Sequence, residues 1–572
     1  MKKILFILIF LLSITLYAKE IKPFGSPNAI KGGQITIHNP EFPKSFNYYV
    51  NNALDASIVF GLIYESLIEI HPETLEFMPL LAKSWTISED KKTFIFEIDE
   101  RAKWADGKDV TAYDVLFTYE TIMNPSNMTS VQRIFLSRFE KPVVLNERKI
   151  KFVAKNVHYN NFITLGGLNI LPKHLFEGKN FNRDFNNMLP PGSGPYTLAE
   201  VKEGRYYVLK RRPDYWGYVL PHHTGIFNFD KIKFKIIRDD NVAFEAFKKG
   251  DFDIFTSITA KRWVTETNSI HFQKNWILRK KIYNYKPKGF SGIALNMRKP
   301  IFKDKRVRQA LFMLLDREDL IKRLMYNEYT PLNSYWATIN KNPKNIYTYN
   351  PEKAKMLLKE AGYDRLDKDG YLINKKGERL EFKINYVTEA FEKHLTSYAE
   401  SCKKAGIKVN LEILSWATLL KKLDNYDFDA ITIGWSTSLF EDPEQLWHSK
   451  HINEAGGNNL PGYANKEVDS LIDSLPPIFD VSKRYEIIRK IDNIIYQDVP
   501  YILFWSADHE KIFYKPIFGM PETYLTKYGN VYDFLVYWWI DPEKEKAYKE
   551  AVKKKLSLPS EEVEIFYDKI KK

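Results

Sequence analysis

Leu80–Glu120 reads LLAKSWTISEDKKTFIFEIDERAKWADGKDVTAYDVLFTYE and decides the fold prediction for this chain. From Thr93 to Ile98 the apolar residues fall mainly on alternate positions, which predicts a strand with one buried face. Ala105-Asp106-Gly107 then marks a turn, and Thr111-Ala-Tyr-Asp opens a helical run with a capping residue at its start. The order is therefore strand, loop and capped helix, and the stretch holds no catalytic motif.

The whole chain is too long to fold around one hydrophobic core. It has 572 residues, of which 44% are hydrophobic and 27% charged, and these fractions are ordinary for a soluble globular protein. Chains of this length divide, so we expect two or more lobes. Predicted strands such as Gln34–His38 alternate with predicted helices such as Asp55–Leu67 without a fixed period. This pattern favours α/β lobes over a solenoid or a β-sandwich.

The first residues have the layout of a secretory signal peptide. Lys2-Lys3 is followed by an apolar run, Ile4–Leu16, and by Tyr17-Ala18 before the charged Lys19. The run has 13 residues, which is too short for a comfortable transmembrane helix. We therefore expect cleavage after Ala18 and export of the mature chain.

Cysteine usage and charge narrow the class of protein further. Cys402 is the only cysteine, so we expect no disulfide, and no cysteine follows the signal to accept a lipid. The formal net charge of +13 is compatible with nucleic acid as a partner. The lysines are spread along the chain, in doublets such as Lys403-Lys404, and we interpret them as solvated surface charge. We expect a periplasmic protein without a lipid anchor that does not bind nucleic acid.

Three further segments, together with the opening stretch, carry a resemblance to one family. They are GIALNMRKPIFKDKRVRQAL (292–311), NPEKAKMLLKEAGY (350–363) and FDAITIGW (428–435). In the second of them, Asn350 and Pro351 start a predicted helix as N-cap and first helical residue. In this order the segments resemble family 5 of the bacterial extracellular solute-binding proteins, which are receptors for peptides or nickel that feed ABC importers.

The resemblance implies a fold class. We expect an α/β, two-lobed periplasmic binding protein of the large peptide-receptor type (class II, cluster C), with an extra subdomain in the first lobe. Within the family the chain is most similar to the subgroup that includes microcin C and peptide importers, on the segments 192–217, 236–255 and 537–541. Two crossings between the lobes are expected, near 280–290 and 505–515, with hinge closure on the ligand.

The expected limits of the parts make the first lobe discontinuous in sequence and the second lobe continuous. The parts are a signal peptide (1–18), the core of lobe I (19–60, 185–285 and 510–572), the subdomain of lobe I (61–184) and lobe II (286–509).

The sequence lacks the common motifs of catalysis. It contains no Gly-x-Ser-x-Gly nucleophile elbow, no Walker A motif, no Gly-x-Gly-x-x-Gly and no His-Glu-x-x-His. We therefore expect neither an enzyme nor a cofactor, and an exported hydrolase is the alternative from another class. Nickel import within the resembling family keeps a nickel or metal-chelate receptor as a second alternative, with His448 and His451 as candidate ligands. We assign no metal ligand in the expected site.

The segment Phe428–Ser438 is the candidate binding surface. A buried strand runs into a glycine, a tryptophan and three hydroxyl residues, so its carboxyl end offers main-chain donors and acceptors beside an aromatic wall. The alternative is that Trp435 is only a core residue at a strand end. The resemblance implies that the segment pairs with a peptide backbone, with a second tryptophan as a wall and a loop of the first lobe opposite. The implied ligand-binding residues are Gly434, Trp435, Ser436, Thr437, Ser438, Trp416, Asn52 and Ala53.

One departure from the family concerns the amino terminus of the ligand. Many relatives place an aspartate just after the Gly-Trp pair to hold that ammonium group. Here Ser436-Thr-Ser438 follows the pair, and acids come only at Glu441-Asp442. We therefore expect a ligand whose amine is blocked, absent or differently placed.

Together these features predict a periplasmic substrate-binding protein of an ABC importer. It is expected to bind peptides or peptide-like compounds between its two lobes and to deliver them to an inner-membrane ABC permease. We expect it to act as a monomer.

Overall fold

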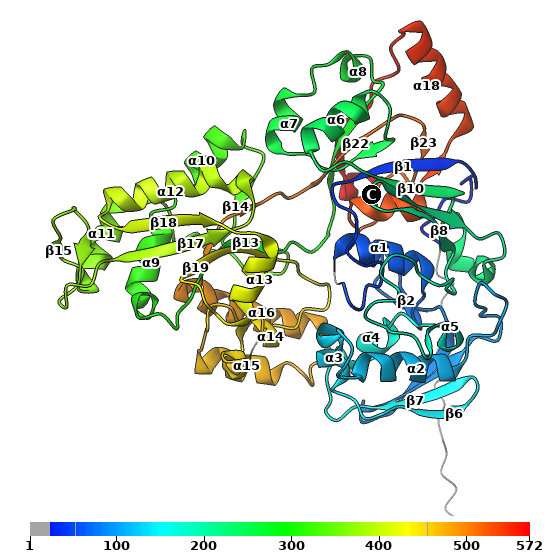
Figure 1. Cartoon of the computed structure of the whole chain (residues 1–572), viewed down its shortest axis with the longest axis horizontal. Helices are drawn as coiled ribbons and strands as arrows, with labels where there is room; N and C mark the ends of the chain where they lie inside the picture. The colour runs from blue at the N-terminus through cyan, green and yellow to red at the C-terminus, as the bar shows by residue number, and fades with distance from the viewer. Residues whose placement is uncertain (1–22, 52, 455, 572) are drawn as a thin grey trace, which may run out of the picture.

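The computed structural model describes residues 23–571 of the chain, apart from 52 and 455. The predicted signal peptide lies outside the described residues. In the described part, no helix combines the length and the apolar sequence needed to cross a membrane. Figure 1 shows two lobes side by side, with the yellow and orange segments in one and the blue, cyan and red segments in the other.

An eight-stranded sheet lies at the centre of the first lobe and draws its strands from both ends and the middle of the chain. The strand β1 pairs parallel with both of its neighbours, β10 and β11. The order across the sheet is β25 (Glu564–Phe566), β12 (Leu278–Tyr283), β22 (Glu510–Tyr514), β11 (Ile254–Phe255), β1 (Gln34–Asn39), β10 (Lys231–Ile236), β9 (Tyr206–Arg211) and β8 (Tyr196–Lys202). The helices of this part are α1 (Leu54–Ile63), α6 (Asp240–Lys248), α7 (Ala260–Thr265), α8 (Ile270–Gln273), α17 (Phe534–Tyr537), α18 (Pro542–Lys554) and α19 (Tyr567–Ile570).

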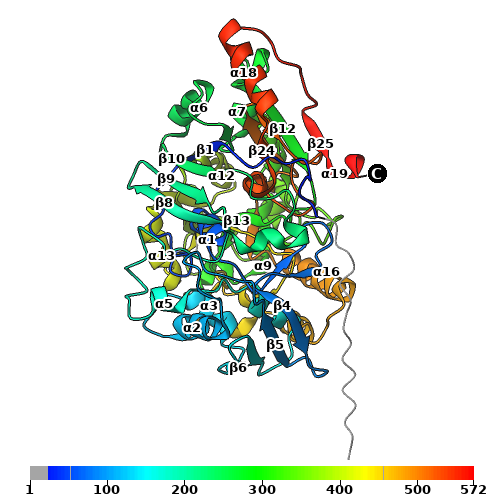
Figure 2. The ribbon, with the colours of Figure 1, turned by 90° about the vertical axis from the view of Figure 1, so that its right-hand side faces the viewer.

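A four-stranded antiparallel sheet forms the subdomain, which lies below the eight-stranded sheet in Figure 2. Its strands, in order, are β4 (Ala82–Ile87), β5 (Thr93–Ile98), β7 (Lys149–Val153) and β6 (Val143–Asn146). The other elements are the hairpin β2 (Ile68–Ile70) and β3 (Phe77–Pro79) and the helices α2 (Ala112–Met123), α3 (Ser130–Leu136), α4 (Asn161–Gly166) and α5 (Lys173–Phe176). The predicted strand is confirmed as β5, whose alternate residues are buried. The predicted cap is also confirmed, because the Thr111 N–H donates to Asp114 Oδ2 over 2.8 Å at the start of α2.

A five-stranded sheet forms the centre of the second lobe. Its strands, in order, are β18 (Lys408–Ile413), β17 (Glu381–Tyr386), β19 (Ala430–Trp435), β13 (Phe290–Leu295) and β20 (Tyr501–Leu503). The helices of this lobe are α9 (Lys305–Met313), α10 (Arg317–Leu324), α11 (Pro351–Glu360), α12 (Glu392–Lys404), α13 (Trp416–Asp424), α14 (Glu444–Trp447), α15 (Lys466–Ser474) and α16 (Val481–Asp498). The predicted start of α11 is confirmed, since the Asn350 side chain accepts from the Lys353 N–H and Pro351 is the first helical residue.

The helix predicted over Asp55–Leu67 is too long, because α1 ends at Ile63. Tyr64 adopts extended backbone angles (φ −116°, ψ 126°), and its hydroxyl donates to the Pro190 carbonyl over 2.5 Å. Tyr64 and Leu67 are both fully buried. Their packing therefore outweighs the local helical preference of the sequence.

Two connections join the lobes, and each lobe has its own core. The chain passes from β12 to β13, and again from β21 (Trp505–Ser506), which pairs with β14 (Thr330–Pro331), to β22. One cluster of buried apolar side chains spans the eight-stranded sheet and the subdomain, and another fills the second lobe. Separate cores allow the lobes to move as rigid bodies about the connections. The exact residue limits of the lobes stay a prediction.

The second core includes side chains of β13, which lies between β19 and β20. Ile293 in β13 is fully buried there, so an Ile293→Ala variant is expected to lose about 2 to 5 kcal/mol in free energy of unfolding, because the substitution leaves a cavity. Urea unfolding followed by circular dichroism measures the loss. The matched control is Ile413→Ala at the end of β18, where the side chain is 48% exposed. Equal losses of unfolding free energy in the two variants would contradict the placement of Ile293 in the core.

Candidate ligand-binding site between the lobes

The strand β19 ends at the edge of the second lobe with Gly434 and Trp435. It pairs antiparallel with β13, so that Trp435 lies opposite Phe290, and parallel with β17 on its other side. The indole N–H of Trp435 donates to the Tyr501 hydroxyl over 3.0 Å. This hydrogen bond fixes the ring at the strand end, and Trp435 stays half-buried rather than enclosed in the core.

A cavity of about 500 Å³ lies beside this strand end, within the second lobe. It is lined by Trp416, Gly434 and Trp435 among other residues. Trp416 stands at the start of α13 and is 51% exposed, which is unusual for so large an apolar side chain. Three of the predicted site residues therefore lie together, and two of them are the predicted aromatic walls. The rest of the lining includes Val387, Phe391, Leu420, Leu423 and Phe504.

A second cavity, of about 690 Å³, lies between the lobes. Thr437 and Ser438 line it from the second lobe, and Leu75, Tyr285 and Tyr528 line it from the first. Leu75 reaches it from the turn between β2 and β3, in a left-handed backbone conformation with φ of 63°. We call this space the inter-lobe cavity. Its walls come from chain segments that are far apart in sequence.

Two of the remaining predicted site residues, Ser436 and Ala53, do not line either cavity. Ser436 is exposed between the two groups of lining residues. Ala53 is exposed at the start of α1 and belongs to neither lining. Asn52 lies outside the described residues. The contribution predicted from this loop of the first lobe therefore stays a prediction.

Glu441 is a functional candidate that the sequence prediction did not assign. It lines the inter-lobe cavity, where Oε2 accepts from the Trp336 indole N–H over 2.9 Å and Oε1 from the Ser438 N–H over 2.6 Å and from the Thr437 hydroxyl. Burial raises the pKa of Glu441 to about 7, although the hydrogen bonds favour the ionised form. The sequence feature that could have pointed to Glu441 is its position as the first acid after Gly434-Trp435.

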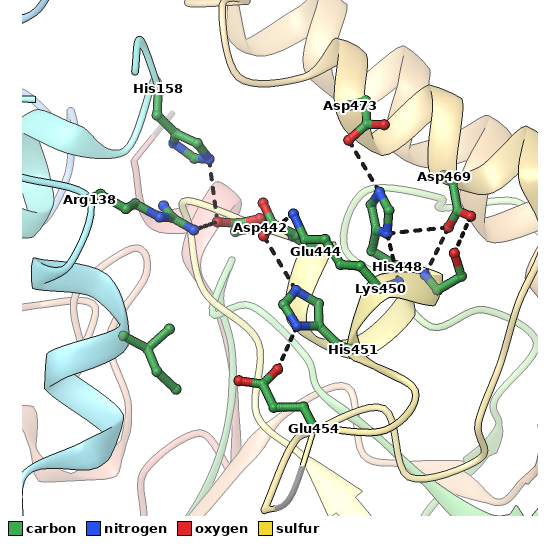
Figure 3. A network of polar contacts seen from close by, with 12 residues as sticks. Arg138, His158, Asp442, Glu444, His448, Lys450, His451, Glu454, Asp469 and Asp473 are labelled. Atoms are coloured by element: carbon green, nitrogen blue, oxygen red, sulfur yellow. Dashed lines mark hydrogen bonds and ion pairs between the residues drawn. The ribbon is translucent and has the colours of Figure 1, made fainter. Parts of the chain in front are cut away.

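Asp442 ties the second lobe to the subdomain of the first. Its Oδ2 lies 2.9 Å from Arg138 Nη2 and 3.4 Å from His158 Nε2, and Figure 3 shows both side chains reaching it from the cyan subdomain. Burial alone would raise the pKa of Asp442, but His158 and Arg138 outweigh it and hold that pKa well below its usual range. The three side chains are mostly buried, so both contacts of Asp442 are shielded from solvent.

Neighbouring contacts strengthen the same junction. The Tyr159 N–H donates to the Pro476 carbonyl over 2.9 Å, and the Asn160 side-chain amide donates to the Phe440 carbonyl over 3.1 Å. The guanidinium of Arg484 lies 4.2 Å from the centre of the Tyr159 ring. The loop that follows β19 therefore lines the cavity with one part and holds the opposite lobe with the next.

Comparison with known proteins identifies the chain. The family described as bacterial extracellular solute-binding proteins, family 5 (Middle), matches residues 76–457. The chain belongs to this family. A putative binding protein of Brucella suis is 27% identical over 559 residues, covering 89% of this chain and 88% of the relative. Oligopeptide-binding protein AppA of Bacillus subtilis is 30% identical over 511 residues, covering 85% of this chain and 88% of AppA.

Solved structures share the fold of this solute-binding protein. AppA in complex with a nonapeptide has a TM-score of 0.74 at 25% identity, and the match covers 90% of this chain and 100% of AppA. NikZ of Campylobacter jejuni in complex with Ni(L-His) has a TM-score of 0.71 at 23% identity, and the match covers 88% of this chain and 99% of NikZ. The predicted fold class and family are confirmed. Likeness to NikZ at this identity concerns the fold alone.

The two histidines of the metal alternative already contact carboxylates. His448 Nε2 lies 3.2 Å from Asp473, and His451 Nδ1 lies 2.5 Å from Glu454, as Figure 3 shows. Of the described residues that line the two cavities, none is a histidine. In the described part of the chain, three potential metal ligands converge only elsewhere. These are Glu69, His222 and His223 in the first lobe, with ligand atoms within 4.8 Å of one another.

Ser193, in the sequence Gly192-Ser193-Gly194, has a structural role. Ser193 is fully buried, and its hydroxyl accepts from the Glu65 N–H over 3.3 Å. The carbonyls of Gly192, Ser193 and Gly194 all accept from the Arg212 guanidinium. This arrangement fixes a turn, and it gives no support to the hydrolase alternative.

The junction at Asp442 is expected to control the distance between the lobes. In an Asp442→Asn variant Arg138 and His158 lose their counter-charge, and breaking such a buried pair costs about 3 to 5 kcal/mol. Small-angle X-ray scattering should then give a larger radius of gyration. The matched control is Glu444→Gln, because Glu444 pairs with Lys450 inside the second lobe. An unchanged radius for Asp442→Asn would contradict this role.

Glu441 is expected to make stability depend on pH. Its pKa in the folded protein, about 7, exceeds the ordinary value of 4.5, so its contribution is fully present below pH 4.5 and is lost as the pH rises through 7. A Glu441→Gln variant should make this decline smaller in thermal unfolding midpoints measured between pH 4.5 and 7.5, and the raised pKa values of Glu65 and Asp533 account for the remainder. Glu444→Gln should retain it, because Lys450 outweighs burial and lowers the pKa of Glu444. A decline that persists unchanged in Glu441→Gln would exclude this carboxyl as its source.

Proposed function

We propose that this protein is the periplasmic receptor of an ABC importer for peptides or peptide-like compounds. It holds its ligand between the two lobes and delivers it to an inner-membrane permease. It is exported by a signal peptide cleaved after Ala18, has no lipid anchor, acts as a monomer and catalyses no reaction.

The observation that carries the proposal is the position of the β19 end between two cavities. Gly434 and Trp435 line the cavity of the second lobe, and Thr437 and Ser438, a few residues on, line the inter-lobe cavity. An extended ligand that lies along this segment meets main-chain donors and acceptors at one edge. Its apolar side chains have Trp416 and Trp435 as walls in the first cavity.

The lining of the two cavities supports peptides over metal complexes. AppA, which is 25% identical in its solved structure, was solved with a nonapeptide. The relative solved with a nickel complex shares the fold, but the described residues of the two cavities here include no histidine. The lining chemistry therefore favours the peptide prediction over the metal alternative.

Native mass spectrometry of the mature protein, with denaturation to identify what co-purifies, tests the proposal. A set of short peptides or peptide-like molecules is the expected result. A protein that carries only a metal ion, and that binds no member of a peptide library, would contradict it.

Trp435 is expected to supply a large part of the affinity. A Trp435→Ala variant should weaken binding of a co-purifying peptide by about 2 to 4 kcal/mol in isothermal titration calorimetry, as for a buried aromatic anchor. Trp85→Ala is the matched control, since Trp85 is half-buried in β4 and lines neither cavity. Unchanged affinity with intact circular dichroism would remove Trp435 from the site.

A further inference from the structure

We propose that the inter-lobe cavity contains an anion subsite formed by Lys288, Lys341 and Arg489, and that the ligand is a peptide-like compound with an acidic side chain. This inference rests on the proposed function, because it names the chemical class of ligand for the same cavity. Lys288 lies on the connection between the lobes, Lys341 in a loop of the second lobe and Arg489 on α16. The cavity thus gathers three cations from three separate segments.

None of the three cations forms an ion pair with another described residue. The adjacent Lys286, by contrast, lies 2.6 Å from Glu510. Asp508 acts on Lys288 electrostatically without forming an ion pair with it, and its Oδ1 lies 2.8 Å from His509 Nδ1. The described residues therefore leave the positive charge of the cavity wall without an ion-pair partner.

Among the described residues that line the cavity, Glu441 is the one acid, and it does not neutralise these cations. The carboxylate of Glu441 accepts from the Trp336 indole, the Ser438 N–H and the Thr437 hydroxyl. Both of its oxygens are therefore directed at the second lobe's own donors. Its raised pKa also means that much of its charge is absent near neutral pH.

Two tyrosine rings lie close to lysine ammonium groups at the boundary between the lobes. Lys341 Nζ lies 5.6 Å from the centre of the Tyr285 ring, and Lys527 Nζ lies 5.2 Å from the same centre and 5.3 Å from that of Tyr528. Such contacts orient ammonium groups while leaving N–H donors free. A fourth cation, Lys527, thus adds to the positive field from the side of the first lobe.

Closure of the lobes makes the unbalanced charge costly. Lys288 is already half-buried, and burial lowers its pKa, which shows that the charged form is losing solvation there. Closing further over a neutral ligand would leave buried cations without partners, which is strongly unfavourable. A carboxylate supplies the missing charge, and the planar guanidinium of Arg489 suits it as a two-pronged donor. The anion therefore favours the closed state specifically.

A competition experiment tests the subsite. Three pentapeptide pools share the same random positions and differ at the central residue, which is Glu, Gln or Lys, and each pool is made with a free and with an amidated carboxyl terminus. Native mass spectrometry of the full mature protein with the mixed pools should enrich Glu peptides about tenfold over Gln peptides, the value of one charge-assisted hydrogen bond. The enrichment should persist in the amidated pools if the side chain is the anion recognised.

Variants assign the effect to the cations. Arg489→Gln and Lys341→Gln should each reduce the Glu enrichment severalfold, whereas Lys490→Gln, the next residue on α16 and exposed, should leave it unchanged. Equal retention of the Glu and Gln pools by the unmodified protein would overturn the anion subsite and leave the peptide receptor intact. Enrichment that disappears on amidation would also overturn it, because the terminal carboxylate is then the recognised group. Failure to bind any pool would instead contradict the proposed function.

Discussion

The contact between the first connection and the end of β19 is the constraint on which the binding region depends. A Cβ atom at position 289 would lie 1.9 Å from the Trp435 carbonyl oxygen, so only glycine lets the connection pass this close. The chain therefore places its hinge directly against the strand that ends at the cavities. Any rotation of the lobes about this connection changes the space next to Trp435, which couples closure to binding.

The charges around the inter-lobe cavity are arranged unequally. On the side of the subdomain, Asp442 is neutralised by Arg138 and His158, so the two lobes are held together there without a ligand. On the other side Lys341 and Arg489 have no counter-charge among the described residues. The lobes are thus in stable contact on the side of Asp442. Close approach of the lobes on the side of Lys341 and Arg489 becomes favourable only when a ligand brings negative charge.

Local chemistry explains which parts the sequence could predict. The caps at Thr111 and Asn350 and the alternation from Thr93 to Ile98 involve residues a few positions apart, and all three predictions are confirmed. Trp416 and Trp435 were also singled out, and they line one cavity. The partnership of Arg138 with Asp442 spans 304 positions, and no local pattern encodes it. For the same reason Lys288 and Lys341 were interpreted, with the other lysines, only as surface charge, and Arg489 was not singled out. The burial of Tyr64, another long-range effect, ends α1 earlier than the sequence predicts.

Amide hydrogen exchange, with and without a peptide that the protein retains, tests most directly whether both lobes hold the ligand. The account predicts slower exchange on peptide binding in both the β2–β3 turn around Leu75 and the loop around Lys341, which line opposite sides of the inter-lobe cavity. The segment after Trp435 should be protected with them. Protection confined to the second lobe, with the turn at Leu75 unchanged under saturating peptide, would contradict binding between the lobes.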